Sequence, residues 1–149
     1  MKGEPFFIDT NIVMYARGKG HPYKASCAQI IFEIAAGSFQ EKFGTPVTDT
    51  EVFQEILYRY ALLGRWETGI LVCQDFLTLG LEVLPIESRE VKRLIELAKL
   101  YQGKGIPPRD LIHLAVMLNH GIRKIISADA HFDLVEEVAR LDPVALSSK

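Results

Sequence analysis

The sequence predicts an α/β fold, with a central, mainly parallel β-sheet flanked by helices on both faces. Short apolar segments alternate along the chain with longer segments whose apolar residues recur at helical spacing. The 149 residues are also enough to bury a sizeable core in one domain, which we expect to span residues 1–149. In folds of this class, ligands bind at the carboxyl ends of the parallel strands.

The N-terminal half is expected to hold two strands and four helices. The first strand is the apolar run FFI, and the glycines and proline of RGKGHP break the helix that follows it. Gly37, Gly64 and Gly80 each follow a stripe of apolar residues at helical spacing and mark the end of a helix. The expected strands cover residues 6–8 and 45–47, and the expected helices cover residues 11–15, 23–36, 50–63 and 66–79.

The C-terminal half continues the alternation. LEVLPI alternates up to its proline and KIIS is a short apolar run, so both are expected strands. Pro107 and Pro108 open a helix that is apolar on nearly all sides, which predicts that it is the most buried helix. The expected strands cover residues 81–86 and 124–127, and the expected helices cover residues 88–101 and 110–119. Residues 131–139 are expected to form a short helix or turn, and residues 140–143 a final short strand or tail.

Four acidic residues are expected at the carboxyl edge of this sheet. Asp9 and Asp129 each follow a strand, Asp110 lies in the first turn of the buried helix, and Glu55 flanks an apolar stripe. Taken singly, Asp9 is equally typical of a helix cap and Asp110 of a partner for the helix dipole. Glu55 is typical of a solvated helix face, and Asp129 of a turn. Four converging carboxylates, however, repel one another strongly unless a cation lies between them.

A hard divalent cation is the partner that such an acidic set favours. Mg²⁺ and Mn²⁺ prefer oxygen ligands, and carboxylates supply them. A cation held in this way orients and polarises a phosphate and lowers the pKa of a bound water, so that water attacks phosphorus without a protein nucleophile. Asn11 and Ser127 are expected to add neutral oxygen contacts, and Asp133 is a candidate fifth acid.

Motifs of several other chemistries are absent from the sequence. It contains no G-x-x-x-x-G-K-[ST], no G-x-G-x-x-G and no G-x-S-x-G, and its four histidines lack zinc-type spacing. We expect His113 to be a buried, hydrogen-bonded imidazole and His131 either to shape a turn or to touch a phosphate. The two cysteines lie outside any C-x-x-C and are expected to be free thiols.

Charge and hydropathy restrict partners and location. The formal net charge of −2 gives no basic footprint for nucleic acid at the level of composition, although a local basic patch remains compatible with it. The sequence has no signal-peptide core and no apolar run of the ~18 residues that a membrane span needs. We therefore expect a cytoplasmic protein that is not bound to a membrane.

Four segments, in this order and at these intervals, carry a family resemblance: FFIDTNIVMYA, TDTEVFQEILYRY, PPRDLIHLAVMLNHGI and KIISADAHFD. The chain resembles the PIN-domain nucleases over about residues 5–143, and most closely the VapC-type toxins of toxin–antitoxin pairs and their archaeal relatives. The resemblance implies a single PIN-like domain. It also implies endoribonuclease activity that depends on Mg²⁺ or Mn²⁺, usually in a homodimer, and an antitoxin protein that holds toxin members inactive.

The family pattern assigns the metal-binding and catalytic acids residue by residue. Asp9 matches the aspartate of the D-T-N opening, and Glu55 matches the glutamate of the Q-E-[IVL] signature, with Glu51 as its competitor one turn earlier. Asp110 matches the aspartate of R-D-x-x-H-x-A. Asp129 matches the aspartate of the T-x-D-x-x-F ending, in which Ser127 here replaces the more usual threonine and Asp133 is an occasional further acid.

An acidic pocket repels RNA, so basic residues are expected around it. Arg109, next to Asp110, is the first candidate for phosphate contact, followed by Arg17 and Lys19, while Tyr15 and Tyr23 are candidates for stacking on bases. Two alternatives to a toxin ribonuclease stay open: a housekeeping PIN nuclease that processes ribosomal or transfer RNA, and a PIN-like module that binds RNA or protein without cutting.

Overall fold

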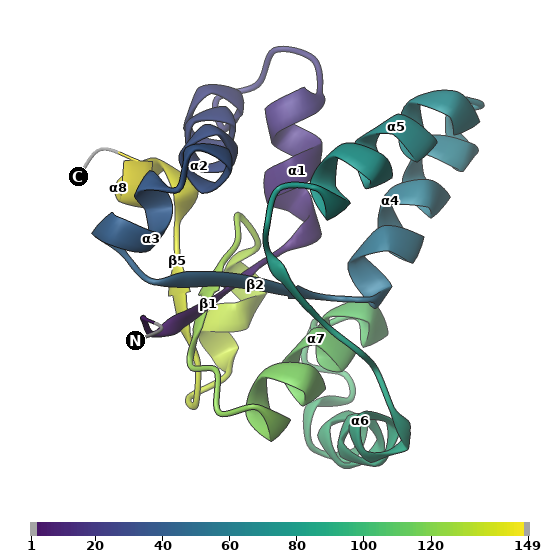
Figure 1. The fold of residues 1–149 in the computed structure, drawn as a ribbon. Coiled ribbons are helices and arrows are strands. Elements are labelled where there is room, and N and C mark those ends of the chain that lie inside the picture. The colour runs from purple at the N-terminus through teal and green to yellow at the C-terminus, as the bar shows by residue number, and fades with distance from the viewer. Residues whose placement is uncertain (1–2, 148–149) are drawn as a thin grey trace.

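Five parallel strands form the centre of the structure, a computed structural model that describes residues 3–147 (Figure 1). Their order in the sheet is β3-β2-β1-β4-β5, and every neighbouring pair is parallel. The predicted α/β fold with a parallel sheet is thus confirmed. The strands are β1 (Pro5–Ile8), β2 (Thr45–Asp49), β3 (Glu82–Leu84), β4 (Lys124–Ile126) and β5 (Ala139–Leu141).

Helices cover both faces of the sheet, as the sequence predicted. In Figure 1, α1, α2, α3 and α8 lie on one side, α6 and α7 pack together on the other, and the α4–α5 pair stands beyond the carboxyl end of β2. The helices are α1 (Thr10–Arg17), α2 (Lys24–Ala36), α3 (Ser38–Lys42), α4 (Glu51–Leu62), α5 (Trp66–Leu77), α6 (Ser88–Tyr101), α7 (Pro108–Asn119) and α8 (Pro143–Ser147), with a 3₁₀ helix, η1, at Ala130–Leu134.

The sequence did not predict α3 and α8. Each has five residues, which is too short for an apolar stripe to show a 3.6-residue period. Gly37, with a φ of 83°, ends α2 and turns the chain into α3, where Phe39 is fully buried. The second strand also runs two residues further than predicted, to Asp49, which matters for the site.

Helix α7 is the central helix of the fold, and eight consecutive residues from Asp110 to Met117 are buried. This confirms that it is the most buried helix, and it explains why it carries so few polar side chains. Phe7 and Ile8 of β1 are fully buried between the two helical layers. Within residues 3–147, no helix combines the length and apolar character needed to cross a bilayer.

Strand register sets the position of the polar residues at the carboxyl edge. Ile8 of β1 lies opposite Ile126 of β4, so the residues that follow them, Asp9 and Ser127, leave the sheet side by side. The Asp9 backbone N–H continues the ladder by donating to the Ile126 carbonyl over 3.1 Å. On the other side of β1, β2 ends at Asp49. Parallel pairing therefore delivers three polar side chains to one edge.

Candidate active site

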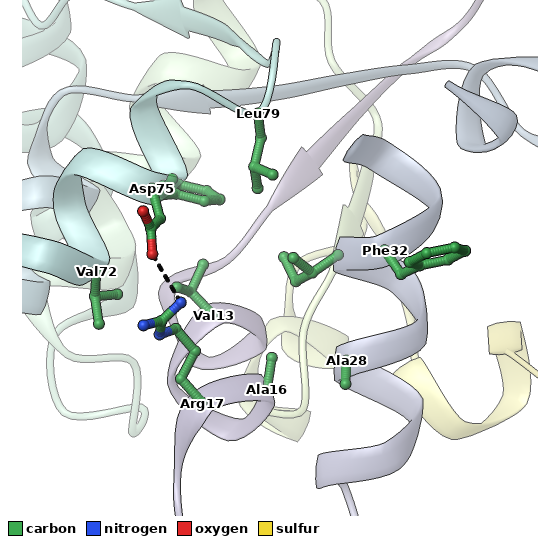
Figure 2. A pocket seen from close by; sticks show the side chains of 10 residues that line it. Val13, Ala16, Arg17, Ala28, Phe32, Val72, Asp75 and Leu79 are labelled. Carbon is green, nitrogen blue, oxygen red and sulfur yellow. Dashed lines mark hydrogen bonds and ion pairs between the residues drawn. The ribbon is translucent and has the colours of Figure 1, made fainter. Parts of the chain in front are cut away.

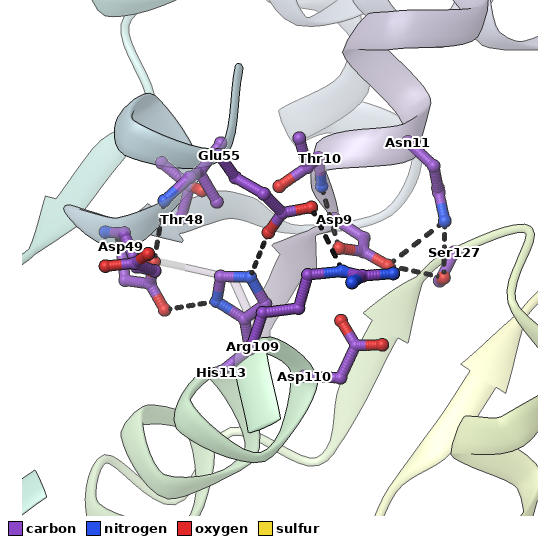
Figure 3. Close-up of polar contacts among 12 residues, drawn as sticks. Asp9, Thr10, Asn11, Thr48, Asp49, Glu55, Arg109, Asp110, His113 and Ser127 are labelled. Atoms are coloured by element: carbon purple, nitrogen blue, oxygen red, sulfur yellow. Dashed lines mark hydrogen bonds and ion pairs between the residues drawn. The ribbon is translucent and has the colours of Figure 1, made fainter. Parts of the chain in front are cut away.

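Asp9 lies where β1 passes into α1 and is only 2% exposed. Its Oδ1 accepts a 2.8 Å hydrogen bond from the Thr10 backbone N–H, the capping contact that its position in the sequence suggested. Its Oδ2 accepts from the Ser127 hydroxyl at 2.6 Å and from the Asn11 side-chain amide at 3.2 Å. The cap and the acidic site are thus roles of a single carboxylate, and they do not exclude each other (Figure 3).

Asn11 and Ser127 join α1 to the end of β4. The Asn11 amide also donates to the Ser127 hydroxyl at 3.1 Å, while its carbonyl accepts from the backbone N–H of Ala128 at 3.2 Å. The Ser127 hydroxyl in turn accepts from the Asp129 backbone N–H at 3.0 Å. These two residues therefore fix the Asp9 carboxylate and the loop that carries Asp129.

Helix α7 supplies Asp110 from its first turn. Because Asp110 and His113 are three residues apart, they lie on the same face of the helix. One ligand atom each from Asp9, Asp110 and His113 lie within 4.8 Å of one another, and so do one each from Asp110, Asp129 and His131. Asp110 therefore stands between two groups of possible ligands. His131 contacts Asp110 and therefore lies in the site. The sequence had left open whether this histidine shapes a turn or touches a phosphate.

His113 is fully buried, and each of its ring nitrogens faces a carboxylate. Its Nδ1 lies 2.7 Å from Asp49 Oδ2 and its Nε2 lies 3.2 Å from Glu55 Oε1 (Figure 3). Ionised carboxylates only accept hydrogen bonds, so an imidazolium with two N–H groups satisfies both partners. The predicted hydrogen-bonded imidazole is confirmed, and its charge offsets two of the crowded acids.

Asp49 is the residue of this site that sequence reasoning missed. It is fully buried at the end of β2, and its second oxygen, Oδ1, accepts from the backbone N–H groups of Glu51 and Val52 in the first turn of α4. A signal was present in the sequence. PVTDTE repeats the arrangement of FFIDTN, in which an aspartate and a threonine follow a strand and precede a helix.

Burial and charge shift the pKa values of these groups in opposite directions. Burial raises the pKa of Asp9 to about 7, and the neighbouring Asp110 and Glu55 add to the rise. It also raises the pKa of Asp110, which the two histidines partly offset. Burial tends to raise the pKa of Glu55, but the hydrogen bond and charge of His113, together with the charge of Arg59, outweigh burial and lower that pKa. Although burial disfavours a charged imidazole, Asp49 and Glu55 together keep the His113 pKa well above its usual value.

Glu55 and Asp129 form the outer parts of the site. Glu55 is buried, while its competitor Glu51 is half-buried. On the solvent side, Arg59 and Arg109 approach Glu55 Oε2 at 3.6 and 3.7 Å. Asp129 has a side chain that is 41% exposed, so it borders solvent.

The predicted metal ligand Glu55 lies outside both ligand groups, although its Oε1 faces His113 of the first group. Asp133 and Lys19 lie outside both groups as well. Asp133 is half exposed and forms a two-pronged ion pair with Arg140, with N–O distances of 3.0 and 3.2 Å. Lys19 is exposed in the loop after α1 and pairs with no acid within residues 3–147.

The third predicted basic residue, Arg17, lies beside a different hollow. An apolar pocket of about 300 Å³ opens between α1, α2 and α5, and Arg17 forms a 2.9 Å ion pair with Asp75 at its wall (Figure 2). Val13 and Val72 line the pocket between these helices. This hollow is distinct in character from the acidic site, because most of its lining is hydrocarbon.

The donor set of the acidic site fits a hard divalent cation. Asp9, Glu55, Asp110 and Asp129 offer oxygen atoms, and the raised pKa values of Asp9 and Asp110 show that their negative charges are not fully offset by the protein. The Thr10 hydroxyl is buried beside them without a well-formed hydrogen bond within residues 3–147, although its weak interaction with Glu55 helps to lower the pKa of that carboxyl.

Comparisons with known proteins agree with this geometry. The family model described as PIN domain matches residues 6–138. Ribonuclease VapC13 of Mycobacterium tuberculosis is 34% identical over 134 residues, which cover 90% of this chain and 97% of that protein.

Two solved structures share the fold. VapBC2 from Rickettsia felis, bound to a promoter DNA fragment, has a TM-score of 0.69 at 19% identity, covering 92% of this chain and 97% of that one. The sarcin–ricin loop cleaving toxin VapC20 of M. tuberculosis has a TM-score of 0.71 at 14% identity, covering 88% and 95%.

Asp9 makes the stability of the metal-free protein depend on pH. Its folded-state pKa of about 7 lies above the ordinary aspartate value of 3.8, so the folded state holds this proton more tightly than the unfolded state does. The Asp9 proton therefore adds a few kcal/mol to the free energy of unfolding. This contribution is fully present below pH ~4 and is lost as the pH rises through ~7. In urea titrations with EDTA, Asp9→Asn should therefore lose less stability than the native protein between pH 5 and 8.

The same titrations with Mn²⁺ supply a second readout. A cation that binds only the folded state stabilises it, so Mn²⁺ should stabilise the native protein at pH 8 and act much less on Asp9→Asn. Equal pH slopes for the two proteins, or equal stabilisation by Mn²⁺, would contradict the role assigned to the Asp9 charge.

Asp49→Asn should destabilise the fold by about 3–5 kcal/mol, because it removes one partner of a buried ion pair and leaves the His113 charge without it. Asparagine keeps an oxygen for the first turn of α4, so the loss of a cap does not explain the effect. Urea unfolding at pH 7 measures it. The surface variant Asp75→Asn, which breaks only the exposed pair with Arg17, is the control and should lose less than about 1 kcal/mol. Similar losses in the two variants would mean that the buried pair contributes nothing special.

Proposed function

The chain belongs to the PIN-domain family, and we propose on this basis that it is a metal-dependent endoribonuclease and the toxin of a toxin–antitoxin pair. One observation carries the proposal: the four acids that match the family pattern gather at one edge of the sheet. Figure 3 shows Asp9, Glu55 and Asp110 there, and a carboxylate oxygen of Asp129 lies within 4.8 Å of one of Asp110. The relative that matches 90% of the chain is itself named a ribonuclease. Hydrolysis of RNA phosphodiester bonds, in the cytoplasm, is the activity that we assign.

Asp9, Glu55, Asp110 and Asp129 are the proposed metal-binding acids, with Asp133 as an outer candidate that would have to leave Arg140. Mg²⁺ or Mn²⁺ is the proposed ion because all of these ligands are oxygen donors. When bound, such an ion supplies charge for the phosphate and lowers the pKa of a coordinated water. Asp129 borders solvent and would meet the substrate side of the ion.

The remaining polar residues hold this arrangement in place. Ser127 and Asn11 donate to the same oxygen of Asp9, so its carboxylate keeps a fixed orientation. His113, held by Asp49, does the same for Glu55. Arg109 is 48% exposed at the rim, so it can exchange its contact with Glu55 for a phosphate of the RNA.

An antitoxin protein is the partner we propose, and a homodimer is the proposed assembly. Support for the antitoxin comes from a solved structure that shares the fold, the toxin–antitoxin complex from Klebsiella pneumoniae, with a TM-score of 0.59 at 14% identity over 92% of this chain and 96% of that one. The apolar pocket between α1, α2 and α5 is the hollow of this chain that an apolar antitoxin side chain would fill.

The activity is tested with purified protein and a mixed panel of structured and single-stranded RNAs. With Mg²⁺ or Mn²⁺ the RNAs should be cut, and EDTA should abolish cleavage. Asp9→Asn should lower the rate at least a hundredfold, because the variant loses a ligand charge. Asp75→Asn, at the wall of the apolar pocket and outside the acidic site, is the matched control and should cleave at the native rate. Cleavage that survives EDTA or Asp9→Asn would contradict the proposal, and a folded, metal-loaded protein that cuts no RNA would favour a non-catalytic binding module.

Arg109→Ala should weaken RNA binding several-fold and leave Mn²⁺ affinity unchanged, since Arg109 faces the substrate side of Glu55. Fluorescence anisotropy with a labelled RNA and a calorimetric Mn²⁺ titration measure the two quantities. Arg65→Ala is a suitable control, because Arg65 lies over the Tyr60 ring between α4 and α5. Equal RNA affinity in the native protein and Arg109→Ala would refute the assignment.

A further inference from the structure

Three aromatic rings gather beside α1, outside the acidic site. The rings of Tyr15 and His21 stack with centroids 4.5 Å apart, those of His21 and Tyr23 lie 5.5 Å apart and nearly parallel, and the two tyrosines lie 5.4 Å apart. We call these three residues the aromatic platform. His21 is exposed and the tyrosines are half-buried, so the platform offers one aromatic ring to solvent.

The exposed ring is held rigidly. The His21 Nδ1 accepts a 3.1 Å hydrogen bond from the Tyr23 backbone N–H, which fixes the ring orientation within the loop after α1. Tyr15 and Tyr23 support the ring by stacking. A ligand that stacks on His21 would therefore lose little side-chain entropy in the protein.

A chain of hydrogen bonds ties the platform to the acidic site. The Tyr23 hydroxyl donates to Asp142 at 3.3 Å, and Arg140 binds the same Asp142 oxygen at 3.4 Å. Arg140 also donates to the Ser127 carbonyl at 3.0 Å, and the Ser127 hydroxyl reaches Asp9.

Helix α1 provides a second link between the two sites. Tyr15 lies one turn beyond Asn11 on the same face of α1. The helix has eight residues and is thus about 12 Å long, so the platform stands a short distance from the acids.

Charge makes this surface suited to nucleic acid. Residues 10–32 contain no acid, and their three cations are Arg17, Lys19 and Lys24. Lys19, in the same loop as His21, is exposed and forms no ion pair within residues 3–147. Arg17, by contrast, is paired with Asp75, and Asp142 accepts from the Tyr23 hydroxyl, so Lys19 is the cation of this segment that is left for a phosphate. An aromatic ring next to such a cation is the combination that single-stranded nucleic acids recognise, because a base stacks on the ring while a phosphate meets the cation.

We propose that the aromatic platform binds a base of single-stranded RNA by stacking on His21, a short distance from the bond that the acidic site cuts. This inference rests on the proposed ribonuclease function and adds a subsite to it. The subsite favours unpaired RNA, since a base must leave its helix to stack on a side chain. Lys19 meets the phosphate next to the stacked base.

Two substitutions of His21 separate stacking from loop structure. His21→Asn removes the ring but keeps an acceptor for the Tyr23 N–H, whereas His21→Phe keeps a ring and removes the acceptor. His120→Asn, at the end of α7, is the control for the same chemical change elsewhere. All forms carry Asp9→Asn, so that a labelled, mixed-sequence single-stranded RNA stays intact while its affinity is measured by fluorescence anisotropy.

His21→Asn should weaken binding roughly five- to a hundredfold, the range for loss of one stacked base, and His21→Phe should stay within about threefold of the parent. A set of RNAs, each with one nucleotide replaced by an abasic one, provides a second test. With the parent protein, the abasic replacement at one position should weaken binding as much as His21→Asn does. With His21→Asn, the same abasic replacement should not weaken binding further. Equal affinities of His21→Asn and His120→Asn, or equal abasic effects in parent and His21→Asn, would overturn the platform.

Cleavage by the forms with native Asp9 distinguishes this inference from the function on which it rests. His21→Asn should raise KM and leave kcat nearly unchanged, because the ring lies away from the reacting phosphate. If the native protein cleaves RNA and His21→Asn has an unchanged KM, the proposed base-binding role of the platform is refuted and the ribonuclease function stands. If the native protein neither binds nor cuts RNA, both the base-binding role and the ribonuclease function are refuted.

Discussion

The rest of the site depends on one buried contact, the imidazole of His113 between the carboxylates of Asp49 and Glu55. Five acids meet near the carboxyl edge of the sheet, and four of them are buried: Asp9, Asp49, Glu55 and Asp110. Their mutual repulsion in a poorly solvated region would oppose folding if no positive charge stood among them. His113 provides that charge from the most buried helix and offsets Asp49 and Glu55, whereas burial still raises the pKa values of Asp9 and Asp110.

This arrangement follows from the topology of the sheet. Because β2, β1 and β4 are adjacent and parallel, Asp49, Asp9 and Ser127 emerge next to one another although they are far apart in the sequence. Helix α7 packs across the sheet and brings Asp110 and His113 to the same edge from below in Figure 1. The polar residues thus have fixed backbone positions, which keeps the distances between their carboxylates small without further ordering on binding.

Several residues serve structure and chemistry at once. Asp9 caps α1 and belongs to the acidic site, and Asp49 holds the first turn of α4 while it binds His113. Arg140 of β5 binds both Asp133 of η1 and the Ser127 carbonyl. The side-chain hydrogen bonds around the site are therefore concentrated on the side of α1, β4 and β5, whereas Lys19 and Arg109 are exposed.

The sequence by itself determined the α/β class, most of the helices and strands, and the placement of acids at the carboxyl edge of the sheet, because apolar periodicity and residues at strand ends are local properties. It also indicated that α7 is the most buried helix. The tertiary structure decided which groups face each other: it pairs Asp133 with Arg140, joins His131 to Asp110 and places Asp49 against His113. These contacts join residues 7 to 64 positions apart, and side-chain pairing over such separations is set by strand order and helix packing, which no local pattern encodes.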